Sequence, residues 1–273
     1  MVPGRSQYRR HRADGEMVVK KVFRISNSAL KNIKTYREEW ETTGYVSTKN
    51  FLDETSAHLL YTLLSKKIPE YWWFRSFKID EEDNMIDEKI NMKLVQKDKS
   101  VKALTDNLLL KCQEAFSRHV YCFSFDSAHA HKTGCPCLLC EYKQFINSGE
   151  FKEFVQAVTN TRPKLNDIHF KATRYQSGQF LAPHTDEHHG FTAAIHHMTQ
   201  NWLPSYGGNL QILSNDSKKV KKTVVPEFNT LTFLDLKNAR YCHGVTHVAP
   251  FVKRSRYALT YWLNKEESKN ESG

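Results

Sequence analysis

Residues 173–186 of the chain read Thr-Arg-Tyr-Gln-Ser-Gly-Gln-Phe-Leu-Ala-Pro-His-Thr-Asp, and this stretch decides the fold. It places an imidazole and a carboxylate two positions apart, at His184 and Asp186. Side chains alternate between faces along an extended strand, so these two point the same way and can share one metal ion. A helix would put them on different faces, and Gly178 and Pro183 interrupt a helical pattern. The stretch therefore predicts a strand end that can bind a metal.

A third ligand is expected on a later strand. Residues 240–263 supply His243 and His247, followed by Arg256. Two imidazoles and one carboxylate with open coordination positions suit Fe(II) that also binds a co-substrate and O2. An arginine on the adjoining strand suits the far carboxylate of 2-oxoglutarate. The two histidines lie four residues apart on one face of a strand, so periodicity does not separate them, whereas the His-x-Val-x-x-Val pattern favours His243.

The size and composition of the chain indicate one catalytic domain. It has 273 residues, of which 40% are hydrophobic and 12% aromatic, and all-β barrels commonly use about 200 to 250 residues as a single domain. We expect that domain over residues 41–266, with supporting helices over 51–160 and a β core over 165–263. Residues 1–40 are predicted to be a basic, partly disordered segment, and 267–273 a disordered tail.

The net charge of +10 permits a polyanionic partner, because a basic surface attracts phosphate. Much of that charge falls in the N-terminal segment, where a solvated, flexible stretch is the ordinary interpretation and nucleic-acid contact the alternative. No run of about 18 apolar residues is present, and the basic N-terminus lacks an apolar signal region. These features predict a cytoplasmic protein without membrane contact, and they leave a nuclear location open.

The order of predicted elements is helices first and short strands second. Asp53 is a plausible N-cap for a helix that ends before Pro69. The other helices are predicted at 27–40, 101–116, 141–147 and 150–158. Strands are predicted at 71–79, 120–125, 168–175, 191–198, 208–213, 220–225, 230–235, 242–248 and 256–263. Closely spaced short strands separated by turns indicate a mainly β fold, a double-sheet jelly roll, with flanking α-helices on one outer face.

Three of the six cysteines are crowded at Cys135, Cys137 and Cys140. With His131 or His129 they would complete a four-ligand structural zinc site, since thiolates suit Zn(II). The spacing differs from that of standard zinc fingers. The alternative is a loop whose thiols are reduced and partly buried by the helix that follows.

Four motifs together resemble the iron(II)- and 2-oxoglutarate-dependent oxygenases, in particular their prolyl hydroxylase-like branch. They are Tyr-x-x-Gly-x-x-Leu-x-x-His-x-Asp at 175–186, Gly-Gly-Asn-Leu at 207–210, His-Gly-Val-Thr-His-Val at 243–248 and Arg-Tyr-Ala-Leu-Thr at 256–260. The resemblance covers roughly residues 168–263, with weaker similarity in the helical half.

The resemblance implies a double-stranded β-helix in which His184, Asp186 and His243 bind Fe(II). It further implies that Arg256 pairs with the distal carboxylate of 2-oxoglutarate and that Tyr175 hydrogen-bonds the same co-substrate. O2 would be the third reagent, and ascorbate a supporting reductant. One departure is Ala258, where many relatives carry Ser or Thr, so Tyr175 is expected to supply the second co-substrate contact.

By the same resemblance, the favoured reaction is hydroxylation of a protein or peptide side chain, with a prolyl residue as the target. Oxidation or demethylation of nucleic acid, or hydroxylation of a free amino acid, is the alternative with the same chemistry. A non-catalytic β-barrel binding module is a different class, and the intact set of ligands argues against it.

Overall fold

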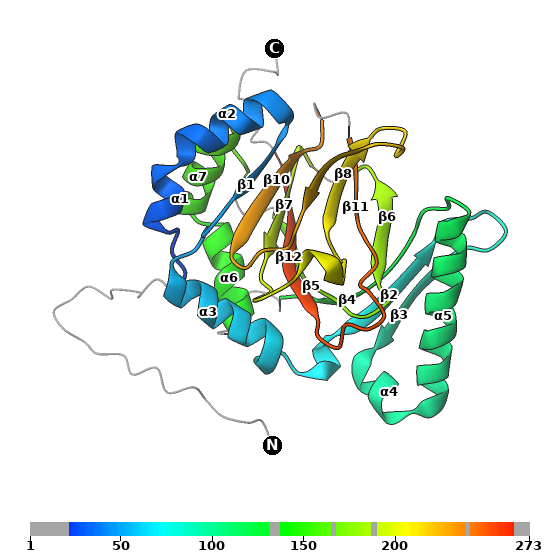
Figure 1. The fold of residues 1–273 in the computed structure, drawn as a ribbon. Helices are drawn as coiled ribbons and strands as arrows, with labels where there is room; N and C mark the ends of the chain where they lie inside the picture. The colour runs from blue at the N-terminus through cyan, green and yellow to red at the C-terminus, as the bar shows by residue number, and fades with distance from the viewer. Residues whose placement is uncertain (1–21, 131–136, 165–167, 187–189, 238–240, 265–273) are drawn as a thin grey trace, which may run out of the picture.

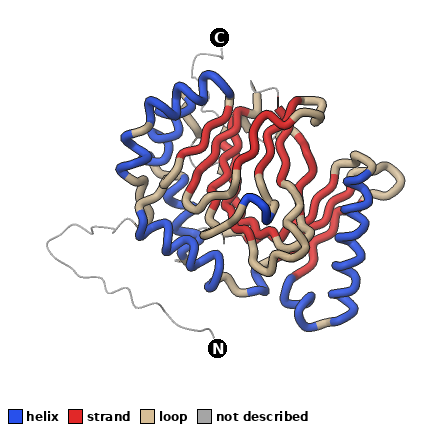
Figure 2. Tube along the Cα trace, in the orientation of Figure 1, coloured by secondary structure: helices blue, strands red, loops and turns tan. Residues whose placement is uncertain are grey.

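The computed structural model of the protein describes residues 22–130, 137–164, 168–186, 190–237 and 241–264. Within these ranges the core is one antiparallel sheet of 12 strands that curls on itself, with helices on two sides (Figures 1 and 2). None of the described helices is long and apolar enough to cross a membrane.

All but one of the described helical elements lie before residue 160. They are α1 Asn27–Lys31, α2 Ile33–Thr43, α3 Glu54–Thr62, η1 Leu63–Lys67, η2 Glu70–Trp72, α4 Met92–Lys97, α5 Lys99–Ser117, α6 Leu138–Ile146, α7 Gly149–Thr159 and η3 Pro204–Tyr206. The strands are β1 Tyr45–Thr48, β2 Phe74–Ile79, β3 Ile86–Asn91, β4 Cys122–Ala128, β5 His169–Tyr175, β6 Phe180–His184, β7 Thr192–His197, β8 Leu210–Ser214, β9 Val220–Val224, β10 Thr230–Asp235, β11 Tyr241–Val245 and β12 Arg256–Leu263.

The sheet order shows how the two halves of the fold join. Strands run β1-β10-β7-β12-β5-β4-β6-β11-β8-β9, and the hairpin β2–β3 branches from β4. Strand β4 pairs with β5 through 126–128 and with β6 through 123–124. Because one strand bridges both halves, the sheet curls around an interior that β5, β6, β11 and β12 all face. The predicted jelly-roll core with flanking helices is confirmed.

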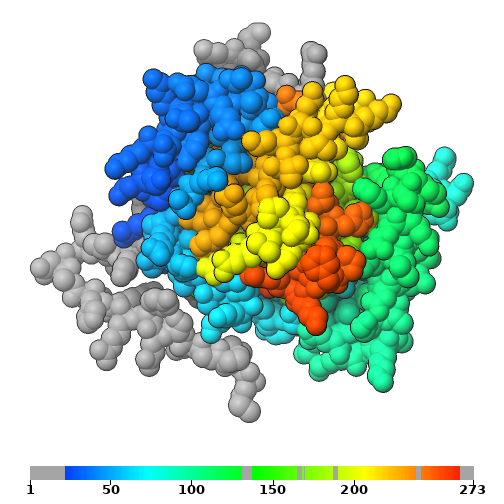
Figure 3. All heavy atoms as spheres, in the orientation of Figure 1, coloured from blue at the N-terminus to red at the C-terminus, as the bar shows by residue number. Residues whose placement is uncertain are grey.

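Alternation along the strands separates the interior of the sheet from its helix-covered face. On β12, Leu259, Tyr261 and Leu263 join the large apolar core shared with α2, α3, α6 and α7, whereas Arg256 and Trp262 face the interior. A second apolar core lies between α5 and strands β2, β4 and β6. Figure 3 shows the resulting flanks, with α1 and α2 in blue and α4 and α5 in green on opposite sides.

Local signals explain the helix boundaries. The Asp53 side chain accepts a hydrogen bond from the Ser56 backbone N–H at 3.0 Å, which confirms the predicted N-cap of α3. Asp98 caps α5 in the same way, and α5 extends the predicted 101–116 helix by two residues at its start and one at its end. Gly44, with φ of 73°, ends α2 in the left-handed conformation.

Three strands, β1, β3 and β6, were not among the strands predicted from the sequence. His184 was predicted to lie at a strand end, and it ends β6, but the extent of this strand was not predicted because Pro183 lies inside it. The charged residues of β3 form an exposed edge strand that pairs only with β2. The predicted strand 242–248 ends at Val245. The predicted domain limits and disordered ends stay predictions, because 1–21 and 265–273 lie outside the described residues.

Candidate metal centre

Strands β6 and β11 bring together residues that are distant in sequence. His184 ends β6, and its register partner across the strand pair is His243 on β11. The pairing shifts between His243 and Val245, at Gly244. A Cβ at Gly244 would lie 2.8 Å from the carbonyl oxygen of Leu181 on β6, so the close approach of the strands requires glycine there. This approach places the two imidazoles side by side.

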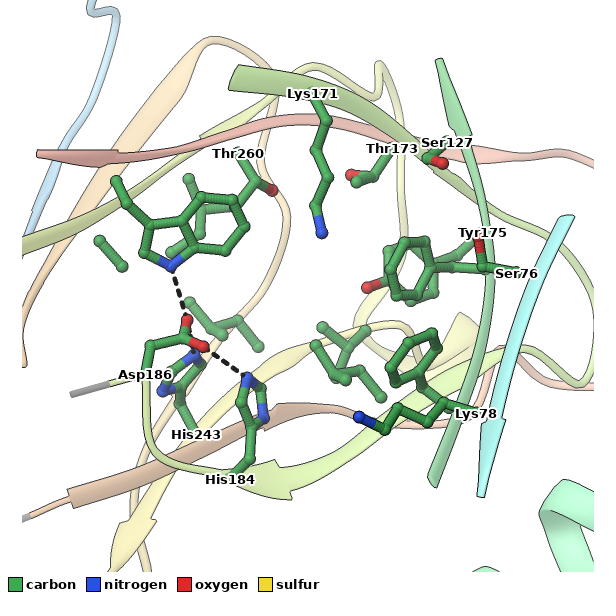
Figure 4. Close-up of a pocket in the computed structure, with 18 of the residues that line it drawn as sticks. Ser76, Lys78, Ser127, Lys171, Thr173, Tyr175, His184, Asp186, His243 and Thr260 are labelled. Atoms are coloured by element: carbon green, nitrogen blue, oxygen red, sulfur yellow. Dashed lines mark hydrogen bonds and ion pairs between the residues drawn. The ribbon is translucent and has the colours of Figure 1, made fainter. Parts of the chain in front are cut away.

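Asp186 completes the cluster, two residues beyond the end of β6. Its Oδ1 lies 3.3 Å from Nε2 of His184, and its Oδ2 lies 3.2 Å from Nε2 of His243. One ligand atom from each residue lies within 4.8 Å of the others, which suits a single ion. Figure 4 shows the carboxylate between the two rings. The structure thus brings together the three residues that the sequence predicted, and among the described residues no other such group was found.

The protonation of these side chains suits metal binding. His184 Nδ1 lies 3.0 Å from the carbonyl oxygen of Ala182, which only accepts, so Nδ1 carries the proton and Nε2 keeps its lone pair for an ion. Burial lowers the pKa of His243, which favours its neutral form. Burial would raise the pKa of Asp186, but the two imidazoles beside it hold it well below its usual range. The set offers two neutral nitrogens and one carboxylate, which fits Fe(II).

The cluster opens into a cavity of about 440 Å³ inside the curled sheet. Arg256 lies in its wall and is only 1% exposed. The guanidinium carbon stands 4.9 Å from the ring centre of Tyr175, the register partner of Arg256 on β5. Nη2 lies 3.3 Å from Nδ1 of His197, whereas Nε has no hydrogen-bond partner within the described part of the chain. Burial lowers the pKa of Arg256 to about 10, which still leaves it cationic at neutral pH. A buried cation with an unsatisfied donor fits a bound carboxylate.

His247, the alternative third ligand, lies elsewhere. Its ring stacks on Phe180 with centroids 4.0 Å apart and contacts Phe116 edge-on at 4.8 Å. Burial lowers its pKa, as expected for a histidine in an apolar cluster. The geometry therefore favours His243 over His247 as the ligand.

Two further residues of this site were missed. Trp262 was not predicted as a site residue, but its Nε1 donates a hydrogen bond to Oδ2 of Asp186 at 2.8 Å. Lys171 lies over the ring of Trp262, with Nζ 4.9 Å from the ring centre. The alternation that places Arg256 on the interior face of β12 also places Trp262 there, and Lys171 shares a face of β5 with Tyr175. That periodicity was the available signal.

The predicted zinc site gains no support. Cys135 and His131 lie outside the described residues, while the thiols of Cys137 and Cys140 lie 3.3 Å apart at the start of α6. The described residues that suit a metal ion are the His184, Asp186 and His243 cluster. Zinc binding stays a prediction.

Comparisons with known proteins agree with this geometry. Residues 170–264 match the model of the 2OG-Fe(II) oxygenase superfamily. A prolyl 3,4-dihydroxylase, OGFOD1 of Ostreococcus tauri, is 24% identical over 144 residues, which cover 50% of this chain and 28% of that protein. The chain thus spans less than a third of the length of that curated relative.

Solved structures share the fold. A prolyl-4-hydroxylase of Pseudomonas putida superposes with a TM-score of 0.50 at 13% identity, over 86% of this chain and 100% of that one. A 2OG-Fe(II) oxygenase family oxidoreductase of Burkholderia pseudomallei gives 0.51 at 10% identity, over 90% and 95%. The matched region, residues 170–264, contains the whole ligand cluster and Arg256, so this part of the chain is similar to the 2OG-Fe(II) oxygenase superfamily.

Proposed function

We propose that the protein is an Fe(II)- and 2-oxoglutarate-dependent dioxygenase that hydroxylates a protein side chain, with a prolyl residue as its target. The observation that carries this proposal is the position of the two-histidine, one-carboxylate cluster in the wall of the same cavity as the buried Arg256. A metal and a dicarboxylate co-substrate can therefore be held together out of bulk water.

The metal would be held by Nε2 of His184, a carboxylate oxygen of Asp186 and Nε2 of His243. Three protein ligands leave open positions for a co-substrate and O2. When bound there, Fe(II) supplies the chemistry that couples oxidative decarboxylation of 2-oxoglutarate by O2 to insertion of one oxygen atom into a substrate C–H bond. Trp262 would fix the carboxylate of Asp186 by its hydrogen bond, so that the carboxylate does not rotate away from the metal.

Arg256 and Tyr175 would hold the distal carboxylate of 2-oxoglutarate. The unpartnered Nε and the nearby Tyr175 ring lie on adjacent strands at paired positions, so one carboxylate can reach both. Burial raises the pKa of Tyr175 to about 12, which keeps the phenol protonated and able to donate. Ala258, next along the interior face of β12, offers no hydroxyl.

A prolyl target is supported by two observations. The curated relative is named a prolyl 3,4-dihydroxylase, and this chain shares 24% identity with it over 144 residues. The cavity wall beside the cluster is aromatic, with Tyr121, Phe123, Phe125 and Trp262, and such faces suit an apolar five-membered ring.

The experiment is incubation of the protein with Fe(II), 2-oxoglutarate and ascorbate, which serves as reductant, followed by mass spectrometry of proline-containing peptides. The expected result is a gain of one oxygen on the proline, with succinate formed in equal amount. Matched peptides with alanine in place of proline are the control. Oxygen transfer to oligonucleotides or free amino acids, with none to peptides, would contradict the proposal.

A further inference from the structure

Three lysines line the same cavity and have no part in holding Fe(II) or 2-oxoglutarate as proposed above. They are Lys78 on β2, Lys89 on β3 and Lys171 on β5. In Figure 4 the Lys171 ammonium projects into the open space, and the Lys78 side chain reaches toward it from the opposite wall. Three strands thus direct amino groups to one cavity, which makes it cationic beside the metal cluster.

The acidic side chains of the cavity do not neutralise this charge. Asp186 is engaged by His184, His243 and Trp262. Asp87 is the other carboxylate in the wall, and it is the register partner of Lys78 across the β2–β3 pair. Asp87 therefore offsets the charge of Lys78, and the positive charges of Lys89 and Lys171 remain in excess.

Lys171 is the most constrained of the three. Its Nζ lies 4.9 Å from the ring centres of both Phe125 and Trp262, and no ion pair to it occurs among the described residues. Burial lowers its pKa to about 8, and the neighbouring Lys89 lowers it further while Asp186 opposes the change. An ammonium held between aromatic faces without a counter-ion costs stability, and such groups concentrate at functional sites.

The position of Lys171 separates it from the co-substrate clamp. Tyr175 pairs with Arg256, whereas Lys171 pairs with Thr260, four residues earlier on β5. At about 3.3 Å per residue this places Lys171 roughly 13 Å along the strand from Tyr175. The Lys171 ammonium lies between the rings of Phe125 and Trp262, so a group that it binds lies beside those two rings.

We propose that the peptide substrate is acidic, with an Asp or Glu close to the target residue whose carboxylate is bound by Lys171 and Lys89. This inference rests on the proposed function, because it names the class of peptide for the same site. The cavity volume of about 440 Å³ must also hold 2-oxoglutarate and the target side chain, which leaves room for a carboxylate rather than for a nucleotide. Lys171 then determines specificity, as the counter-ion of the substrate.

The test is a binding measurement that does not depend on catalysis. Protein loaded with Mn(II) and 2-oxoglutarate, without O2, is titrated with fluorescent proline peptides that differ only by Glu or Gln beside the proline. The acidic peptide should bind about tenfold more tightly, and the difference should shrink as salt is raised. Lys171→Met should abolish the preference, and Lys171→Arg should restore most of it.

The control is Lys93→Met. Lys93 also lies over an aromatic ring, 5.7 Å from the centre of Tyr71, but it is exposed and does not line the cavity. This variant should retain the full preference. Succinate production in the absence of peptide is measured in parallel, because it reports co-substrate binding alone.

Three outcomes would overturn the inference. The first is equal affinity of the wild type for the Glu and Gln peptides. The second is a rise in the 2-oxoglutarate requirement of Lys171→Met that matches its loss of peptide affinity, which would assign Lys171 to the co-substrate. The third is stronger competition by an oligonucleotide of equal charge than by the acidic peptide. Tight, Lys171-dependent binding of the acidic peptide without oxygen transfer would instead contradict the proposed prolyl hydroxylation and leave the acidic preference standing.

Discussion

Trp262 on the last strand donates a hydrogen bond from its indole Nε1 to Oδ2 of Asp186, at 2.8 Å. Nε2 of His184 and Nε2 of His243 lie 3.3 and 3.2 Å from the oxygens of Asp186, so the carboxylate at the centre of the cluster has neighbours on β6, β11 and β12. The C-terminal strand therefore orients a ligand that lies 76 residues earlier in the chain. Groups that hold metal ligands in this way fix the orientation of the ligands and contribute to metal affinity.

Trp262→Phe should keep an aromatic ring at this position and remove the indole N–H that donates to Asp186. We expect metal affinity to fall by about 10- to 100-fold with little change in folding, because the carboxylate is freed to rotate. Calorimetric titration with Mn(II) measures this. Trp202→Phe is the matched control, since its Nε1 donates instead to the Gly207 carbonyl oxygen at 2.8 Å, and this variant should bind metal normally.

His243→Ala should lose bound iron, whereas His247→Ala should retain it. His243 lies 3.2 Å from Asp186, while His247 stacks on Phe180. His247→Ala should instead lower thermal stability, because it removes a half-buried ring that stacks on Phe180. Metal analysis of both purified variants decides between them, and iron retained only in His243→Ala would make His247 the ligand.

Arg256→Ala should raise the 2-oxoglutarate requirement far more than it changes iron content. Removing one member of a buried charge pair costs about 3 to 5 kcal/mol, or roughly two to three orders of magnitude in affinity. Arg254→Ala is the control, since Arg254 is exposed and donates to the carbonyl oxygens of Gln200 and Asn201. Similar effects of the two substitutions on the concentration of 2-oxoglutarate needed for succinate production would count against a carboxylate clamp.

Asp126→Asn should destabilise the fold in a pH-dependent way. Burial would raise the pKa of Asp126, but Arg75 and Arg174 hold it below its ordinary value. Such an acid stabilises the protein fully above its unfolded pKa of about 3.9 and loses that contribution as the pH falls through the folded value. At pH 7 the free energy of unfolding, measured with urea, should fall by about 3 to 5 kcal/mol. The difference in this free energy between variant and wild type should become smaller in acid.

Asp106→Asn is the control for that comparison. Asp106 pairs with Lys102 on the exposed surface of α5, at 2.5 Å, and exposed pairs contribute about 1 kcal/mol or less. Two results would show that the buried network is not the source of the stability. One is an equal loss of unfolding free energy in both variants, and the other is a difference between Asp126→Asn and wild type that stays constant down to acidic pH.

The sequence predicts the ligand cluster because strand periodicity and the order of the motifs are local properties. Such local patterns predicted the site residues His184, Asp186 and Arg256. They also predicted the Asp53 cap of α3. Trp262 and Lys171 were missed as site residues because their roles come from contacts between strands. A pattern along one strand shows which face a residue occupies but not which strand lies opposite.

Pairing across the sheet also decided between the two histidines. His243 and His247 share a strand periodicity, and only the pairing of β11 with β6, with its shift at Gly244, brings His243 to His184. Strand β3 was missed for a related reason. Only Ile86 and Ile90 of its six residues are apolar, and its extended form depends on pairing with β2.

The central claim is that His184, Asp186 and His243 hold an iron that turns over 2-oxoglutarate. The direct measurement is succinate production by protein reconstituted with Fe(II), comparing wild type with Asp186→Ala. We predict Fe(II)-dependent succinate from the wild type, and from the variant neither succinate above background nor firmly bound iron, because loss of one of three ligands leaves the ion weakly held. Near-normal succinate from Asp186→Ala with a full equivalent of bound iron would contradict the assignment.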